Sequence, residues 1–266
     1  MTRDSPAQHI RMNMSSDPTQ RFSDRVENYE KYRPRYPKAF FDYLRDELGL
    51  FKGSAVADVG SGTGISAETL VERGIVVYAI EPNAPMREAA ERKLAKRPNF
   101  KSVNSTAEET TLPDRSVDLV LAAQAFHWFD KPRAKAEFKR ILKSGGRVAL
   151  VWNERKLDAS PFLTDYESML LQFGTDYKAI RHENVTEEVL TEFFAPHGFE
   201  TRVFENSQDF DYAGLQGRLL SSSYVPAPGQ GNYEQIIKAL KSVFDRHQKG
   251  GKVRMEYETR VRVGKV

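Results

Sequence analysis

The chain has 266 residues, of which 39% are hydrophobic and 29% are charged, a composition typical of a globular domain. Lysine and arginine exceed aspartate and glutamate by only three, and both signs are mixed along the chain, so nothing favours a nucleic-acid-binding groove. The absence of cysteine excludes disulfides, thiolate catalysis and cysteine-ligated metal sites.

The first 21 residues are polar and contain no apolar stretch of the kind found in signal peptides, so we expect a disordered leader over 1–21. No apolar run elsewhere approaches the length of a membrane-spanning helix. We therefore expect a cytoplasmic protein with a single domain over residues 22–266 and with no membrane or nucleic-acid partner. The oligomeric state stays open.

An arm rich in aromatic and basic residues, 29–37, precedes the first expected helix at 37–49. The first expected strand, 54–60, then runs into a glycine turn in which Asp58 is followed by Gly60, Gly62 and Gly64. A dinucleotide-binding turn needs glycine at its first, third and sixth positions, and the sixth here is Ile65. The Asp58 carboxylate would also repel a pyrophosphate and suits a ligand with positive charge. An NAD-dependent oxidoreductase is therefore disfavoured but stays an alternative.

Strands and helices alternate from the glycine turn to residue 153. Apolar runs predict strands at 76–81, 100–104, 117–123 and 146–152, and helices begin near Gly64, Asn83 and Asp130. This alternation predicts a parallel sheet covered by helices on both faces, with ligands bound at the carboxyl ends of the strands. Four polar residues fall at or just beyond those ends: Asp58, Glu81, Glu108 and Gln124.

The alternation stops after residue 153. Periodicity predicts a helix that starts at Ser160, another over 186–195, a strand at 199–205, a helix at 233–247 and a final strand at 253–263. Residues 214–231 contain glycines, serines and prolines and read as irregular.

The glycine turn and the segments that follow it resemble the class I S-adenosylmethionine-dependent methyltransferases. The most similar branch contains ubiquinone and menaquinone C-methyltransferases and trans-aconitate-type O-methyltransferases. The resemblance covers roughly residues 22–153 and is carried, in order, by segments 58–64, 81–86, 106–108, 112–121, 124–129 and 142–148.

The resemblance implies an α/β fold, namely a Rossmann-like, doubly wound sheet of seven strands, mostly parallel with an antiparallel last strand and with helical cap insertions. Residues 22–153 would form the cofactor-binding half. Residues 154–185 and 207–231 would be cap insertions over the substrate, and 186–206 and 232–266 would complete the sheet.

The resemblance also implies S-adenosyl-L-methionine as the cofactor. Glu81 would accept hydrogen bonds from the ribose, Met86 would pack on the adenine, and Tyr32 or Arg33 would meet the methionine carboxylate. The predicted cofactor-binding residues are Tyr32, Arg33, Asp58, Gly60, Ser61, Gly62, Thr63, Gly64, Glu81, Pro82, Met86, Thr106, Ala107, Glu108, Gln124, Ala125 and Phe126.

A small-molecule methyl acceptor is the expected partner, and His127, Trp128, Arg218 and Tyr224 are the residues predicted to bind it. His127 is a candidate general base because an imidazole titrates near neutral pH, but the alternative that it only packs the pocket wall stays open. Arg218 could bind a carboxylate acceptor, which would need no base. Since methyl transfer mainly needs alignment of the reactants, a non-catalytic adenosylmethionine-binding module is a further alternative.

Overall fold

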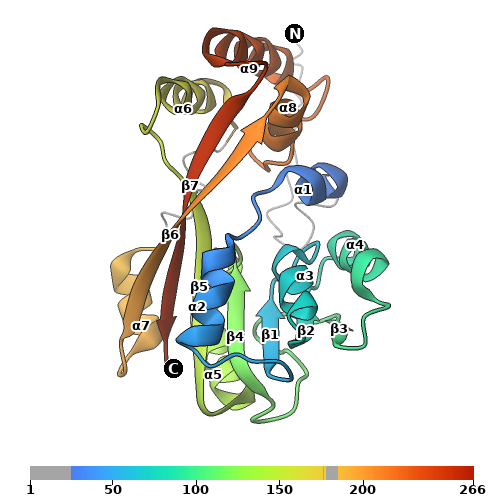
Figure 1. Ribbon diagram of the computed structural model, residues 1–266, viewed down its shortest axis with the longest axis vertical. Coiled ribbons are helices and arrows are strands. Elements are labelled where there is room, and N and C mark those ends of the chain that lie inside the picture. Colours follow the sequence, from blue (N-terminus) through green and yellow to red (C-terminus); the bar gives the residue numbers. More distant parts are fainter. Residues whose placement is uncertain (1–24, 176, 178–184) are drawn as a thin grey trace, which may run out of the picture.

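The computed structural model describes residues 25–175, 177 and 185–266, so the leader expected at 1–21 lies outside the described residues. One sheet of seven strands has the order β3-β2-β1-β4-β5-β7-β6 (Figure 1). Its parallel part consists of β1 (Ala55–Val59), β2 (Val76–Ile80), β3 (Phe100–Val103), β4 (Val117–Ala123) and β5 (Leu142–Arg155). The last strand, β7 (Val253–Gly264), runs antiparallel between β5 and β6 (Phe199–Phe210). The predicted sheet is confirmed.

Helices cover both faces of the sheet. The helices α2 (Lys38–Asp46), α3 (Ile65–Glu72) and α4 (Ala84–Leu94) contribute to one apolar core, and α5 (Lys131–Ile141) and α7 (Glu187–Phe194) contribute to the other. Successive residues of β5 point to opposite cores, because side chains alternate along a strand. Ala149 and Val151 belong to the first core, while Leu150 and Trp152 belong to the second.

Local capping chemistry explains where several helices begin. Asn83 and Asp130 each accept a hydrogen bond from the backbone N–H three residues later, at 3.0 and 3.2 Å, and a proline occupies the first turn of both helices. Ser160 caps α6 (Pro161–Phe173) in the same way. In the part of the chain that the structure describes, no helix combines the length and apolarity needed to cross a membrane.

Three strands are longer than the sequence predicted. β5 has 14 residues and β6 and β7 have 12 each, so the expected strands at 146–152 and 199–205 were too short. The missed residues 206–209 have low strand propensity, but they pair with residues 254–257 of β7. These extensions run past the parallel part of the sheet and carry a second layer of helices (Figure 1).

This second layer, called the cap here, consists of α6, α8 (Tyr212–Leu220) and α9 (Tyr233–His247), which share an apolar cluster with the ends of β6 and β7. Two expectations are corrected. The helix α9 packs on α6 rather than completing the sheet. The stretch 214–231 begins inside α8, which Asp211 caps by accepting a 2.7 Å bond from Gly214 N–H. The sequence did not predict this helix, because it contains two glycines and glycine is a poor helix former.

Candidate functional site

The glycine turn joins the end of β1 to the start of α3, and Asp58 lies beneath it. This carboxylate is fully buried, and Ser66 Oγ donates a hydrogen bond of 2.7 Å to its Oδ2. Burial raises the pKa of Asp58 to about 7, and the neighbouring charge of Glu81 also raises it. Burial disfavours the ionised form of this carboxylate, and a cation or strong hydrogen-bond donor close to it would stabilise that form.

Two of the three glycines are needed for different reasons. A Cβ on Gly60 would lie 2.4 Å from Ala125 Cβ, so this glycine lets the loop after β4 pack directly on the turn. Gly62 has φ +56°, and a Cβ there would meet nothing within 4 Å. The turn therefore touches protein at Gly60 and faces open space at Gly62.

Polar atoms around this open space are buried and unsatisfied. Among the described residues, Asp58 Oδ1, Ser61 Oγ and Thr63 Oγ1 are buried side-chain atoms that have no hydrogen-bond partner. Buried polar groups are nearly always paired in folded proteins, and exceptions need an explanation. A polar ligand seated on the glycine turn would satisfy all three.

Glu81 follows β2 and connects two turns. Its Oε2 accepts from Gly62 N–H and its Oε1 from Asn83 N–H, both at 2.9 Å. Burial raises the pKa of Glu81, whereas these backbone bonds lower it. The carboxylate thus stands beside the glycine turn, as predicted. Each of its oxygens keeps a further acceptor position for a ligand.

The remaining predicted cofactor residues are placed in different ways. Met86, after Pro82, is buried at the start of α4. Thr106 is exposed, Ala107 lies in a sheet core, and Glu108 accepts a bond from the backbone N–H of Asp130. The carboxylate of Glu108 thus helps to begin α5, and cofactor binding by segment 106–108 stays a prediction.

The loop after β4 has a constrained backbone. Gln124 has φ +61°, a left-handed conformation that is uncommon outside glycine, and its N–H donates to Val151 O at 2.8 Å. Phe126 is fully buried and packs on Phe193 with ring centroids 4.6 Å apart, so it belongs to the core rather than to a ligand site. His127 and Trp128 stack on each other with centroids 4.7 Å apart.

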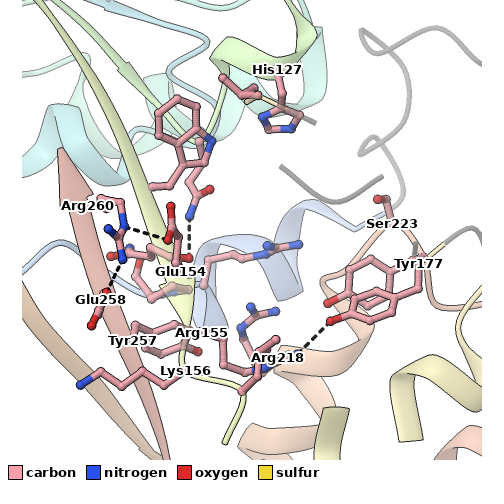
Figure 2. Close-up of a pocket in the computed structure, with 18 of the residues that line it drawn as sticks. His127, Glu154, Arg155, Lys156, Tyr177, Arg218, Ser223, Tyr257, Glu258 and Arg260 are labelled. Carbon is pink, nitrogen blue, oxygen red and sulfur yellow. Dashed lines mark hydrogen bonds and ion pairs between the residues drawn. The ribbon is translucent and has the colours of Figure 1, made fainter. Parts of the chain in front are cut away.

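A cavity of about 770 Å³ lies between this loop and the cap (Figure 2). Six residues that were predicted to contact the cofactor or the acceptor line it, and they come from both halves of the chain: Arg33, Gln124, His127, Trp128, Arg218 and Tyr224. Figure 2 shows His127 at one end and Arg155 and Arg218 at the other. Because Ala125, between two lining residues, packs on Gly60, the His127 end adjoins the glycine turn.

Several lining residues were missed by the sequence reading, above all Tyr29, Arg155, Tyr177 and Tyr257. The Arg155 guanidinium pairs with the buried Glu167 and donates to Tyr177 Oη at 2.9 Å. One sequence signal was available. Glu167 is a charged residue on the apolar face of α6, between Tyr166 and Leu170, where a buried partner is needed.

Two further arginines of the cavity have only neutral hydrogen-bond partners among the described residues. Arg33 donates to Ser221 O at 2.8 Å, and Arg218 donates to Ser222 Oγ at 3.1 Å. Burial lowers the pKa of Arg33, and the nearby charge of Arg218 lowers it further. Burial alone would raise the pKa of the Tyr224 phenol. The guanidiniums around it, Arg218 first, outweigh burial, so this pKa is lowered.

The helix α1 (Val26–Tyr32), which was not predicted, connects the two layers. Glu30 pairs with Lys93 of α4 at 2.9 Å, and Arg25 donates to backbone carbonyls beyond α8, including Val225 O at 2.8 Å. Tyr32 packs where a Cβ of Gly217 would be, 2.0 Å from its ring. The side chain of Tyr32 therefore contacts the cap helix α8, and its predicted contact with the cofactor stays a prediction.

Comparisons with known proteins agree with this geometry. A family model described as a methyltransferase domain matches residues 57–150. An uncharacterized methyltransferase of Geobacillus thermodenitrificans is 31% identical over 184 residues, which cover 67% of this chain and 83% of that protein. The chain belongs to the class I S-adenosylmethionine-dependent methyltransferases.

Other relatives extend the likeness. An uncharacterized methyltransferase of Mycobacterium tuberculosis is 42% identical over 134 residues. The match covers 50% of this chain and 52% of that relative, so the chain spans about half of the relative's length. A solved structure described as a type II methyltransferase from Anaeromyxobacter dehalogenans has a TM-score of 0.66 and 26% identity, covering 88% of this chain and 98% of its own. The chain therefore shares its overall fold with this solved structure over most of its length.

Proposed function

We propose that the protein uses S-adenosyl-L-methionine to methylate a small molecule, at a carboxylate or hydroxyl oxygen. The observation that carries this proposal is the set of buried, unpaired atoms on the glycine turn, Asp58 Oδ1, Ser61 Oγ and Thr63 Oγ1, beside the open space at Gly62. When bound, the cofactor supplies an electrophilic methyl group on a positively charged sulfonium. The Asp58 carboxylate and the two hydroxyls fit a ligand that carries both positive charge and hydroxyl groups.

The chain's own residues divide the remaining work between two regions. Around the turn, Glu81 would accept hydrogen bonds from ribose hydroxyls, and Met86 would supply apolar contact. In the cavity, Gln124, His127 and Trp128 would orient the acceptor at the end that adjoins the turn. His127 would take the proton of a hydroxyl acceptor, whereas a carboxylate acceptor needs no base. Alignment and exclusion of water are the main tasks in such a transfer.

The first test is a calorimetric titration with S-adenosylmethionine and, separately, with NADH. We expect micromolar binding of S-adenosylmethionine and no binding of NADH, because Ile65 stands where a dinucleotide turn needs its third glycine. A preference for NADH would contradict the proposal. Single-turnover transfer of a labelled methyl group to candidate acceptors then separates an enzyme from a non-catalytic binding module.

Gly62→Ala tests the placement of the ligand on the turn. Its Cβ would meet no protein atom, so the free energy of unfolding should fall by only about 1–2 kcal/mol, the cost of a left-handed alanine. Cofactor affinity should fall at least about tenfold, because the methyl group fills the space that the ligand needs. Calorimetry and thermal unfolding measure the two effects. Unchanged cofactor affinity would place the ligand elsewhere.

A further inference from the structure

Two cationic side chains in the cavity have no carboxylate partner among the residues that the structure describes. In the ranges that the structure describes, neither Arg33 nor Arg218 has a carboxylate oxygen within 4.0 Å, whereas Arg155, Arg260 and Arg262 of the same cavity each pair with a glutamate. Arg218 is only 7% exposed. The hydrogen bonds of Arg33 and Arg218 go to a serine carbonyl and to serine hydroxyls, which carry no charge.

This arrangement is unfavourable without a ligand. A buried charge is costly unless it is paired, and two guanidiniums near each other also repel. Both side chains keep an unused donor as well, since Arg33 Nε and Arg218 Nε are buried and have no hydrogen-bond partner among the described residues. An anion placed between the two guanidiniums would attract both charges and accept hydrogen bonds from the unused N–H groups.

We propose that Arg33 and Arg218 form an anion subsite that binds a carboxylate or phosphate group of the acceptor, and that this anchored group is not the one methylated. The inference rests on the proposed methyltransferase function for the identity of the ligand as the acceptor. It narrows that function, because the acceptor must then carry an anionic group and a separate nucleophilic atom.

The position of the subsite supports the second part of the proposal. Arg218 lies at the cap end of the cavity, and the loop of His127 lies at the end that adjoins the glycine turn (Figure 2). Methyl transfer also consumes a lone pair of the accepting atom. An anion held by two guanidiniums directs its lone pairs at N–H groups, which makes it a poorer nucleophile.

The test measures anion binding to the full chain without cofactor. Inorganic phosphate and succinate are titrated at constant ionic strength, with chloride as the replaced ion, by calorimetry and by thermal shift. The variants are Arg218→Gln, Arg33→Gln and a matched control, Arg260→Gln. The Arg260 guanidinium also lines the cavity but already pairs with Glu154 at 3.0 Å and Glu258 at 2.5 Å.

We expect at least one of the two anions to bind the wild type and the control with equal affinity, and to bind each subsite variant at least about tenfold more weakly. Two results would overturn the subsite: no binding of either anion to the wild type, or equal losses in Arg260→Gln. If one subsite variant fails to fold, the other decides. None of these results depends on whether S-adenosylmethionine binds, so failure of the subsite is distinguishable from failure of the proposed function.

Two further measurements separate the subsite from the cofactor site and from the transfer end. Saturating succinate should change the affinity for S-adenosylmethionine less than about twofold; a tenfold loss would assign Arg33 to the methionine carboxylate instead. With labelled S-adenosylmethionine, succinate should give no base-labile methyl ester. Formation of that ester at a catalytic rate would overturn the claim that the anchored group is not methylated.

Discussion

Asp58→Asn should stabilise the cofactor-free protein at pH 8 while it abolishes tight cofactor binding. The folded state raises the pKa of Asp58 to about 7, so the ionised carboxylate is disfavoured in the folded protein. Three pKa units correspond to about 4 kcal/mol, which is the upper limit of the expected gain in the free energy of unfolding. Asparagine keeps an oxygen that can accept the hydrogen bond from Ser66.

The sign of the pH dependence follows from the two protonation states. Near pH 4 the folded protein holds the proton on Asp58 and the unfolded chain still holds about half of it, so wild type and variant should differ little. Between pH 4 and 7 the unfolded chain loses this proton first, and the folded state loses stability relative to it. The gain from Asp58→Asn should therefore grow across this range and be constant above pH 8. Thermal unfolding at pH 4, 6 and 8 measures it, and an equal effect at all three would show that burial of the charge is not the cause.

The same substitution reports on the cofactor. If the ionised carboxylate attracts the positive charge of S-adenosylmethionine, wild-type affinity should rise about tenfold between pH 6 and 8, as the ionised fraction of Asp58 rises. The variant removes this contribution and leaves only the titration of the ligand itself. Matching pH profiles in the two proteins would mean that Asp58 acts through structure alone.

Arg155→Gln should have the largest destabilising effect of the substitutions considered. The Arg155 guanidinium is the charged partner of Glu167, and their side chains are only 9% and 11% exposed. Loss of the arginine removes this ion pair from a buried carboxylate to which the Tyr177 hydroxyl also donates at 2.7 Å, and such losses cost about 3–5 kcal/mol. Thermal or denaturant unfolding of the cofactor-free protein measures the change.

Arg218→Gln is the matched control for this prediction. It removes a guanidinium of the same cavity for which the described residues supply no carboxylate partner, so the free energy of unfolding should change by less than about 1 kcal/mol or should increase. A second control, the double variant Arg155→Met with Glu167→Leu, should recover most of the stability, since it leaves no charge unpaired. Equal losses in Arg155→Gln and Arg218→Gln would contradict the account of which arginine is paired.

The amino-acid sequence alone determined most of the helices and strands and the family. Apolar runs predicted β1, β2, β3 and β4, because most of their residues are buried between helices on both faces of the sheet. Periodicity predicted the full length of α9, because this helix buries one regular face. Backbone geometry at the ends of strands requires particular residue types within a few positions. A short stretch of sequence therefore predicted the turn of Asp58, Gly60, Gly62 and Gly64 and the position of Glu81.

Only the tertiary structure decided the shape of the cavity between the β4 loop and the cap. Residues with poor strand propensity extend β6, because β7 pairs with them. The contact with Tyr32 explains why a helical position holds glycine at 217, since the Tyr32 ring occupies the place of a Cβ. The charge of Arg155 is neutralised by Glu167. Arg33 and Arg218, 185 positions apart in sequence, share the cavity, and no carboxylate of the described residues pairs with either of them. Burial and charge pairing of this kind depend on contacts between distant segments, so no local pattern predicts them.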